Sequence, residues 1–239
     1  MEQNQMVIQV DKLQFSWQDD SPHLLDIDEL SVPRKERIFI KGASGSGKST
    51  LLGLLGGVIT PQRGRINVLD TEVNMLSSSR RDAFRADHIG FIFQMFNLIP
   101  YLSLVENIIL PCCFSRSRCQ RVLKNNGSLA GEAVRLLSHL GLEGDELLSR
   151  PVTELSMGQQ QRVAAARALI GSPDILIADE PTSSLDADSR ESFLELLFNE
   201  CRSEEITLVF VSHDASLEPM FDRTIELHDI NRAAPEVMI

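Results

Sequence analysis

The stretch "RIFIKGASGSGKSTLLGLLGGV", Arg37 to Val58, decides the class of fold. Its opening "RIFI" is an apolar run typical of a buried strand, and "STLLGLL" is a short apolar helix pattern that Gly56 and Gly57 should end. Between the two, "GASGSGKS" fits GxxxxGK[ST], a pattern that binds phosphate when it follows a strand and opens a helix. The stretch therefore predicts an α/β fold with a strand, a phosphate-binding loop and a helix.

Each residue type in this loop suits phosphate chemistry. Glycines allow backbone N–H groups to curl around phosphate oxygens, and the helix start adds partial positive charge. Lys48 is predicted to reach the β- and γ-phosphates, Ser49 to hold Mg²⁺ and Thr50 to add a hydroxyl. A plain glycine-rich turn would need neither the lysine nor the hydroxyl. The predicted nucleotide-binding residues are Gly42, Ser44, Gly45, Ser46, Gly47, Lys48, Ser49 and Thr50.

Composition narrows the classes of function. The chain has 239 residues, of which 43% are hydrophobic, enough for a packed core. A formal net charge of -11 argues against nucleic acid as a partner. The sequence has no signal peptide and no apolar run of roughly 18 to 20 residues, so we expect a cytosolic chain whose membrane role needs another subunit. Its four cysteines lack zinc-site spacing and are interpreted as reduced thiols.

Further strands are predicted on both sides of the loop. "MVIQVDKLQFSW" and "LLDIDELSV" near the N-terminus are β-type runs that predict an antiparallel layer. Near-continuous apolar runs, typical of parallel strands buried on both faces, are "IGFIFQ" (89–94), "DILIADE" (174–180) and "TLVFVSH" (207–213). "RTIEL" is a last short strand. The core is therefore expected to be α/β.

The β-type runs stop between Gln94 and Leu155, where helices are expected instead. The helical patterns are "SLVENIIL", "SLAGEAVRLLSHLGL" and "GDELLSR", and "SRSRCQRVLKNN" is interpreted as a solvated basic loop or helix face. This organisation predicts a catalytic α/β core of residues 1–94 and 159–239, interrupted by a helical subdomain of residues 95–158.

Two carboxylates end the run "ILIADE". The carboxyl ends of strands are where an α/β sheet presents ligands. Asp179 is predicted to bind Mg²⁺ through water, and Glu180 to orient or deprotonate the attacking water as general base. Alone, two acids after a strand would fit a solvated turn or a helix cap, but the phosphate loop favours the catalytic interpretation.

Two more polar side chains follow predicted strands. His213 comes after "LVFVS", where its imidazole could contact the γ-phosphate, although a lone histidine is more often a surface or core residue. Gln94 ends "IGFIFQ" with an amide able to contact both Mg²⁺ and water. It also begins the helical insertion, so a movement there could be transmitted outward.

A second helix start lies in "LSMGQQQRVAAARAL", Leu155 to Leu169. Ser156 with Gln159 three residues later resembles a capping box, which would be enough for a plain capped helix. The same geometry also directs backbone donors at an anion. Both interpretations hold together, because the cap places the donors.

Taken in order, these motifs resemble the ATP-binding cassette (ABC) ATPases of transporters over nearly the whole chain. The corresponding parts are the Walker A loop "GASGSGKST", the Q-loop Gln94, the signature "LSMGQ", the Walker B strand "ILIADE", the D-loop "SSLD" (Ser183 to Asp186) and the switch histidine His213. The resemblance implies a P-loop NTPase with a RecA-like core, an N-terminal antiparallel β layer and an inserted α-helical subdomain. It implies ATP and Mg²⁺ as cofactors, with Trp17 stacking on adenine, although Trp17 or Phe15 could be a core aromatic instead.

The resemblance also implies a homodimer with two ATP molecules, each between the Walker A loop of one chain and the signature of the other. Ser156 and Gly158 would donate to the γ-phosphate, with Gln159 at the helix start, and Asp186 belongs to the same nucleotide-binding set. Two residues depart from the pattern. Met157 and Lys35 each replace a glycine, and Met157 is expected to be tolerated because its side chain can point away from phosphate.

The segment "FQMFNLIPYLSLVENIILP" is similar to the branch that includes the LolD and MacB ATPases. The expected function is an ATPase subunit that energises a separate integral-membrane permease in an export or lipoprotein-related system, from the cytoplasmic face of the inner membrane. A regulatory ATPase acting through a permease-like partner, and the ATPase of an importer, remain open. A non-transport role in DNA repair or translation would need a long coiled-coil insertion or a second cassette, and the sequence has neither.

Overall fold

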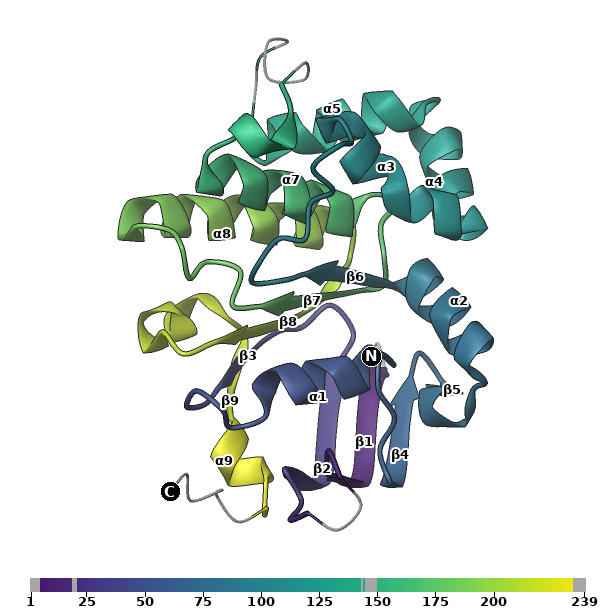
Figure 1. Ribbon diagram of the computed structural model, residues 1–239, viewed down its shortest axis with the longest axis vertical. Helices are drawn as coiled ribbons and strands as arrows, with labels where there is room; N and C mark the ends of the chain where they lie inside the picture. Colours follow the sequence, from purple (N-terminus) through teal and green to yellow (C-terminus); the bar gives the residue numbers. More distant parts are fainter. Residues whose placement is uncertain (1–4, 19–20, 143, 145–149, 234–239) are drawn as a thin grey trace. The chain divides into compact units, whose positions relative to one another are not determined.

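The computed structural model describes residues 5–18, 21–142, 144 and 150–233 (Figure 1). The chain divides into two compact units, one of Met1–Asp82 with Thr207–Ile239 and one of Ala83–Ile206. Most of the predicted helix "GDELLSR" lies outside the described residues. Among the described helices, none is long and apolar enough to cross a membrane.

An antiparallel sheet forms part of the first unit, as the N-terminal runs predicted. Strand β1 (Met6–Phe15) pairs with β2 (Leu25–Pro33) and with β4 (Arg63–Val68), and β4 pairs with β5 (Thr71–Glu72). The sequence did not reveal β4, because "RGRINV" carries only two apolar residues, and those two are its buried ones.

Parallel strands form the second part of the first unit. Strand β3 (Arg37–Lys41) pairs with β8 (Thr207–Ser212) and with β9 (Arg223–Glu226). All six residues of β8 are buried, which confirms a strand covered on both faces. Helix α1 (Lys48–Leu55) follows β3 and its loop, and it ends at Gly56 as predicted.

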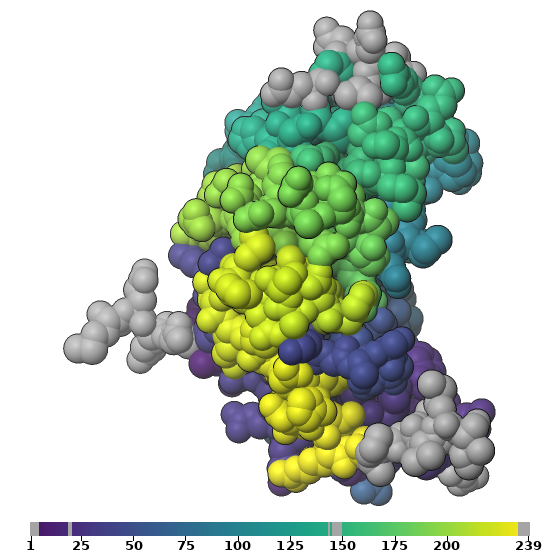
Figure 2. All heavy atoms as spheres, turned by 90° about the vertical axis from the view of Figure 1, so that its left-hand side faces the viewer, coloured from purple at the N-terminus to yellow at the C-terminus, as the bar shows by residue number. Residues whose placement is uncertain are grey.

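Short helical elements follow several of these strands. They are the 3-10 helix η1 (Val73–Met75), helix α2 (Ser78–His88), the 3-10 helix η3 (Ala215–Met220) and helix α9 (Leu227–Ile230). The chain after β8 lies at the surface, in yellow in Figure 2. The register pairs Lys41 of β3 with Ser212 of β8, so both strands end at the same edge.

The second unit combines two parallel strands with a group of helices. Strand β6 (Ile89–Ile92) pairs with β7 (Ile175–Asp179), and Ile92 lies opposite Ala178. The helices are α3 (Leu104–Phe114), α4 (Arg116–Asn126), α5 (Leu129–His139), α7 (Met157–Leu169) and α8 (Ala187–Ser203), with a 3-10 turn η2 (Val152–Glu154). Helices α3, α4 and α5 pack on one another, and α3 and α5 pack on α7 (Figure 1). The described residues between Gln94 and Leu155 are thus helical or irregular, as expected.

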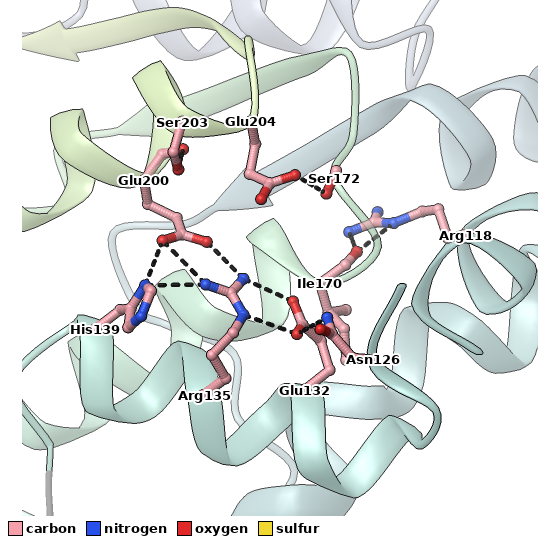
Figure 3. A network of polar contacts seen from close by, with 10 residues as sticks. All are labelled: Arg118, Asn126, Glu132, Arg135, His139, Ile170, Ser172, Glu200, Ser203 and Glu204. Carbon is pink, nitrogen blue, oxygen red and sulfur yellow. Dashed lines mark hydrogen bonds and ion pairs between the residues drawn. The ribbon is translucent and has the colours of Figure 1, made fainter. Parts of the chain in front are cut away.

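The basic segment "SRSRCQRVLKNN" corrects an expectation. It is helix α4, and Arg118 within it is only 2% exposed, so the segment is not simply a solvated face. Figure 3 shows the Arg118 guanidinium at the Ile170 carbonyl; its Nε donates to Ile170 O (2.7 Å) and its Nη2 to Ala168 O (2.8 Å). These carbonyls lie at the C-terminal end of α7, where a cation is favoured. Burial nevertheless lowers the pKa of Arg118 to about 10.

A second buried network joins α5 to α8. Arg135 lies between Glu132 and Glu200, with 2.7 Å from its Nη2 to a carboxylate oxygen of each (Figure 3). Both glutamates are almost fully buried, and His139 also contacts Glu200 (3.0 Å). The bond to Glu132 is the main reason why the pKa of Arg135 is raised. Paired charges of this kind tolerate burial only when their hydrogen bonds are satisfied.

Helix α7 lies directly against strand β6. A Cβ atom placed on Gly90 would be 2.3 Å from Ala168 O and 3.0 Å from the Ala168 carbonyl carbon. Because these atoms belong to the backbone, they cannot turn aside as a side chain could. Glycine at this position therefore sets how closely the C-terminal end of α7 approaches the sheet.

We expect Gly90→Ala to lower the free energy of unfolding by about 2 kcal/mol, the usual size of an overpacking cost. Gly53→Ala in helix α1 is the matched control, because its Cβ would meet Ile59 at an ordinary 3.5 Å. Alanine there should leave stability unchanged or raise it by up to about 1 kcal/mol. Urea denaturation of both variants checks this, and equal midpoints would contradict the close contact at Gly90.

Candidate functional site

The phosphate loop has a backbone that depends on its glycines. Gly45 (φ +77°) and Gly47 (φ +97°) adopt the left-handed region, which other residues rarely enter. A Cβ on Gly42 would lie 2.7 Å from Ser46 Oγ. No side chain caps the start of α1 at Gly47. The loop is therefore tight, and the first N–H groups of α1 are not occupied by a capping side chain.

Lys48 and Ser46 are polar residues of this loop whose side-chain atoms are buried. Lys48 is 6% exposed, and its Nζ donates to the carbonyl oxygens of Gly42 and Ala43, at 2.8 Å each. Ser46 Oγ is buried and has no hydrogen-bond partner among the described residues. A buried hydroxyl without a partner is costly unless a ligand or water completes it. The loop thus fits an oxygen-rich anion.

His213 and the phosphate loop leave the same edge of the sheet. Since Lys41 and Ser212 pair in register, Gly42 and His213 are the next residues along two adjacent strands. The His213 side chain is exposed. The structure therefore brings these two predicted site residues together within the first unit.

The sequence left open whether Trp17 or Phe15 is a core aromatic, and burial distinguishes the two residues. Phe15 is 5% exposed and belongs to the core, whereas Trp17 is 66% exposed. Their ring centroids are 5.1 Å apart in an edge-to-face arrangement. Trp17 therefore presents an indole face that can stack on a planar ligand.

In the second unit, too, predicted site residues follow adjacent parallel strands. Ile92 and Ala178 pair in register, so Gln94 and the Asp179–Glu180 pair follow adjacent parallel strands at one edge. Glu180 has a left-handed backbone (φ +43°), which is unusual for a residue with a side chain. Strain of this kind persists only where the surrounding structure enforces it, and it is enriched at functional sites.

Gln94 lies in a tight turn after β6. Phe96 N donates to Phe93 O (3.0 Å), so Gln94 and Met95 form the exposed tip of the turn. Phe96 and Asn97 are both left-handed, with φ of +56° and +49°. The predicted Q-loop is therefore an ordered turn.

The signature helix begins with the predicted capping box. Gln159 N donates to Ser156 Oγ (3.3 Å), and Ser156 N donates to Gln159 Oε1 (2.9 Å). Met157 is 52% exposed. A Cβ on Gly158 would meet its nearest neighbour, Leu185, at 3.5 Å, which is ordinary contact. Within the described part of the chain, the space around residue 158 would thus admit a larger residue.

Asp186 is the N-cap of helix α8. Its Oδ1 accepts from Ser189 N and its Oδ2 from Ser189 Oγ, at 2.9 Å each. The bond from the Ser189 backbone is the main cause that lowers the pKa of Asp186. Contact of Asp186 with a nucleotide stays a prediction.

Lys35, which stands where the sequence pattern has glycine, lies in a turn with a left-handed backbone. Lys35 is left-handed (φ +64°), the conformation that favours glycine, and its N–H donates to Thr207 Oγ1 (2.8 Å). The turn is therefore formed without glycine, at a cost in backbone strain.

Comparisons with known proteins find similar sequences and a similar fold. A family model described as ABC transporter matches residues 25–183. The ABC transporter ATP-binding protein YtrE of Bacillus subtilis strain 168 is 40% identical over 216 residues, covering 89% of this chain and 87% of YtrE. The lipoprotein-releasing system ATP-binding protein LolD of Xanthomonas oryzae pv. oryzae is 38% identical over 200 residues, or 84% of this chain and 78% of LolD. A dimeric post-hydrolysis state of the ATP-binding cassette MJ0796, bound to ADP and Pi, is similar with a TM-score of 0.79 and 32% identity, covering 92% and 93% of the two chains.

The cap at Asp186 makes the stability of α8 depend on pH. Because the folded-state pKa lies below its ordinary value of 3.8, the ionised cap stabilises the fold above that pH, and this contribution disappears as pH falls through the folded pKa. We expect Asp186→Ala to lower the thermal midpoint at neutral pH, with a difference from wild type that shrinks below pH 3.8. Asp188→Ala, in the same turn, is the control and should have a smaller effect. A deficit of equal size at every pH would contradict the assignment.

Proposed function

The chain belongs to the ABC transporter family of ATP-binding proteins, and from this premise we propose that it hydrolyses ATP to drive a separate membrane permease of the lipoprotein-releasing type. The phosphate loop carries the proposal. Lys48 at the first position of α1, two left-handed glycines and a buried, unpartnered Ser46 hydroxyl form a cradle for the phosphates of ATP.

Binding of ATP is assigned to the loop and its neighbours. The backbone N–H groups from Gly42 to Thr50 surround the phosphates, and Lys48 Nζ turns from the loop carbonyls to the β- and γ-phosphate oxygens. Trp17 stacks on the adenine through its exposed ring. Ser49, Gln94 and Asp179 offer oxygens that suit Mg²⁺, a cation that neutralises charge between the β- and γ-phosphates when bound.

Hydrolysis is assigned to Glu180 and His213. Glu180 orients the water that attacks the γ-phosphorus and accepts its proton, while the bond to the ADP oxygen breaks and phosphate leaves. The left-handed backbone of Glu180 supports this role, because enforced strain fixes where the carboxylate points. His213 contacts the γ-phosphate from the end of β8.

A second copy of the chain completes each site in this proposal. Ser156 and Gly158 offer donors at the start of α7, whose dipole favours the γ-phosphate of an ATP bound by the partner. Gln159 fixes the cap, and Asp186, the N-cap of α8, is assigned to the same nucleotide-binding set. Since ADP lacks the γ-phosphate, hydrolysis removes this contact. Dimeric cassettes among the similar structures support the arrangement.

The permease contact is assigned to exposed apolar side chains of the second unit. Met95 (80%), Tyr101 (84%) and Phe114 (73%) are largely exposed, and Met95 is next to Gln94. A permease surface packed against these side chains would remove their apolar area from water. Contact with a permease would place the chain at the cytoplasmic face of the inner membrane.

Glu180→Gln should bind ATP yet fail to hydrolyse it, because the amide keeps the shape but cannot accept the proton. The ATP-bound dimer should then accumulate, which gel filtration with ATP would show. Glu195→Gln on α8 makes the same charge change and should hydrolyse at the wild-type rate. A fully active Glu180→Gln enzyme would exclude Glu180 as the base.

Gly158→Asp should abolish turnover, because a carboxylate would face the γ-phosphate of the partner's ATP. Met157→Gly should change the rate little, since the Met157 side chain already points into solvent. Steady-state ATPase rates of both variants check this. Activity that appeared only after Met157 was replaced by glycine would show that the natural signature is defective.

A further inference from the structure

Arg167 lies at the opposite end of α7 from the signature and holds the turn that carries Gln94. Its Nη1 donates to Asn97 O (2.6 Å), and its Nη2 donates to Phe96 O. The side chain is 9% exposed, and its partners among the described residues are these two main-chain carbonyls. A guanidinium fork donates to the two oxygens from two separate nitrogens in a fixed planar geometry, which a lysine ammonium on its flexible stem does not reproduce.

The turn depends on this contact for its shape. Phe96 and Asn97 are consecutive left-handed residues, a conformation that is less favourable than an ordinary backbone for residues other than glycine. In that conformation their carbonyls converge on one guanidinium. Farther along the chain, Asn107 of α3 bonds the backbone of Ile99 and Leu102. The loop is thus tied on its downstream side, while its tip, Gln94 and Met95, is exposed.

Arg167 is itself fixed in place. The residues from Val163 to Leu169 are buried, and the close contact at Gly90 seats the end of α7 on β6. Arg118 bonds Ala168 O and Ile170 O, immediately beyond Arg167 (Figure 3). A helix rises about 1.5 Å per residue, so Arg167 is roughly 16 Å from Ser156 along one continuous helix.

We propose that Arg167 is a positioning residue for ATP hydrolysis: it joins the Gln94 turn to the signature helix, so that the two move as one body. This inference rests on the proposed roles of Gln94 and the signature. In a dimer, Gln94 serves the ATP of its own chain and Ser156 that of the partner. The Arg167 contact therefore couples one ATP site to the other.

The burial of Arg167 favours this role over simple packing. Desolvation lowers the pKa of Arg167, which shows that the charge is held at a cost. A well-packed apolar side chain would stabilise the helix without that cost. An apolar side chain could not, however, hold two carbonyls at a defined distance from a moving helix.

The test compares Arg167→Met with Arg162→Met in the full-length chain. Arg162, on the same helix, also donates to a main-chain carbonyl, that of Leu140, and burial lowers its pKa too. We expect Arg167→Met to lower kcat about tenfold, with the dissociation constant of a fluorescent ATP analogue changed by less than about twofold. Arg162→Met should keep its kcat at a similar thermal midpoint. Arg167→Lys, which retains the charge but lacks the planar fork, should be intermediate.

A double variant separates positioning from stability. If Arg167 acts through Gln94, the combination of Gln94→Ala and Arg167→Met should be no slower than Gln94→Ala alone. Multiplicative losses, or equal kcat in the two arginine variants, would overturn the inference. If Arg167→Met does not fold, the same cycle is run with Arg167→Lys.

The two levels of the proposal fail in different ways. A Gln94→Ala enzyme with the wild-type rate would overturn the proposed role of Gln94 and the inference with it. A slow Gln94→Ala enzyme beside an unaffected, folded Arg167→Met enzyme would overturn the inference alone.

Discussion

Parallel pairing of buried strands is the constraint on which each group of site residues depends. Apolar residues fill both faces of these strands, so polar side chains can appear only where a strand ends. In the first unit, the pairing of Lys41 with Ser212 sends the phosphate loop and His213 out from one edge. In the second, the pairing of Ile92 with Ala178 does the same for Gln94 and Asp179. Register therefore positions the chemistry, because a shift of one residue would separate these neighbours.

Helix α7 depends on a different interaction, the bond between arginine and main-chain carbonyl oxygen. Arg118 satisfies carbonyls at the C-terminal end of α7, and Arg167 reaches from α7 to the turn after β6. Neither arginine has a carboxylate among its hydrogen-bond partners in the described residues, so helix and turn dipoles carry the compensation. Hydrogen bonds from a guanidinium to carbonyl oxygens compensate the positive charge and also fix the distance between the side chain and the backbone that it contacts. This is a suitable property for a helix whose start we propose to bind the γ-phosphate of a partner's ATP.

Features that depend on a few neighbouring residues could be predicted from the sequence. The phosphate loop, the capping box at Ser156 and the continuous apolar strands were all recognised, because each is encoded within a few neighbouring residues. Strand β4 was missed for lack of apolar residues. Arg118 and Arg167 were missed because each resembles an ordinary charged helix residue in sequence. Their carbonyl partners are distant in sequence: Ile170 is 52 residues from Arg118, and Asn97 is 70 residues from Arg167. No short sequence pattern can reveal such pairs.

Residues 35, 47 and 158 differ in how strongly the surrounding chain favours glycine. At residue 47 a positive φ and a neighbouring Leu25 side chain both demand glycine. At residue 35 the φ is also positive, yet lysine occupies it, so the turn forms at a cost in backbone strain. At residue 158 the chain itself places no such demand, since a Cβ would find ordinary contact. Because the chain itself leaves this space open, glycine at residue 158 suits the close backbone approach that we propose for the γ-phosphate of the partner's ATP.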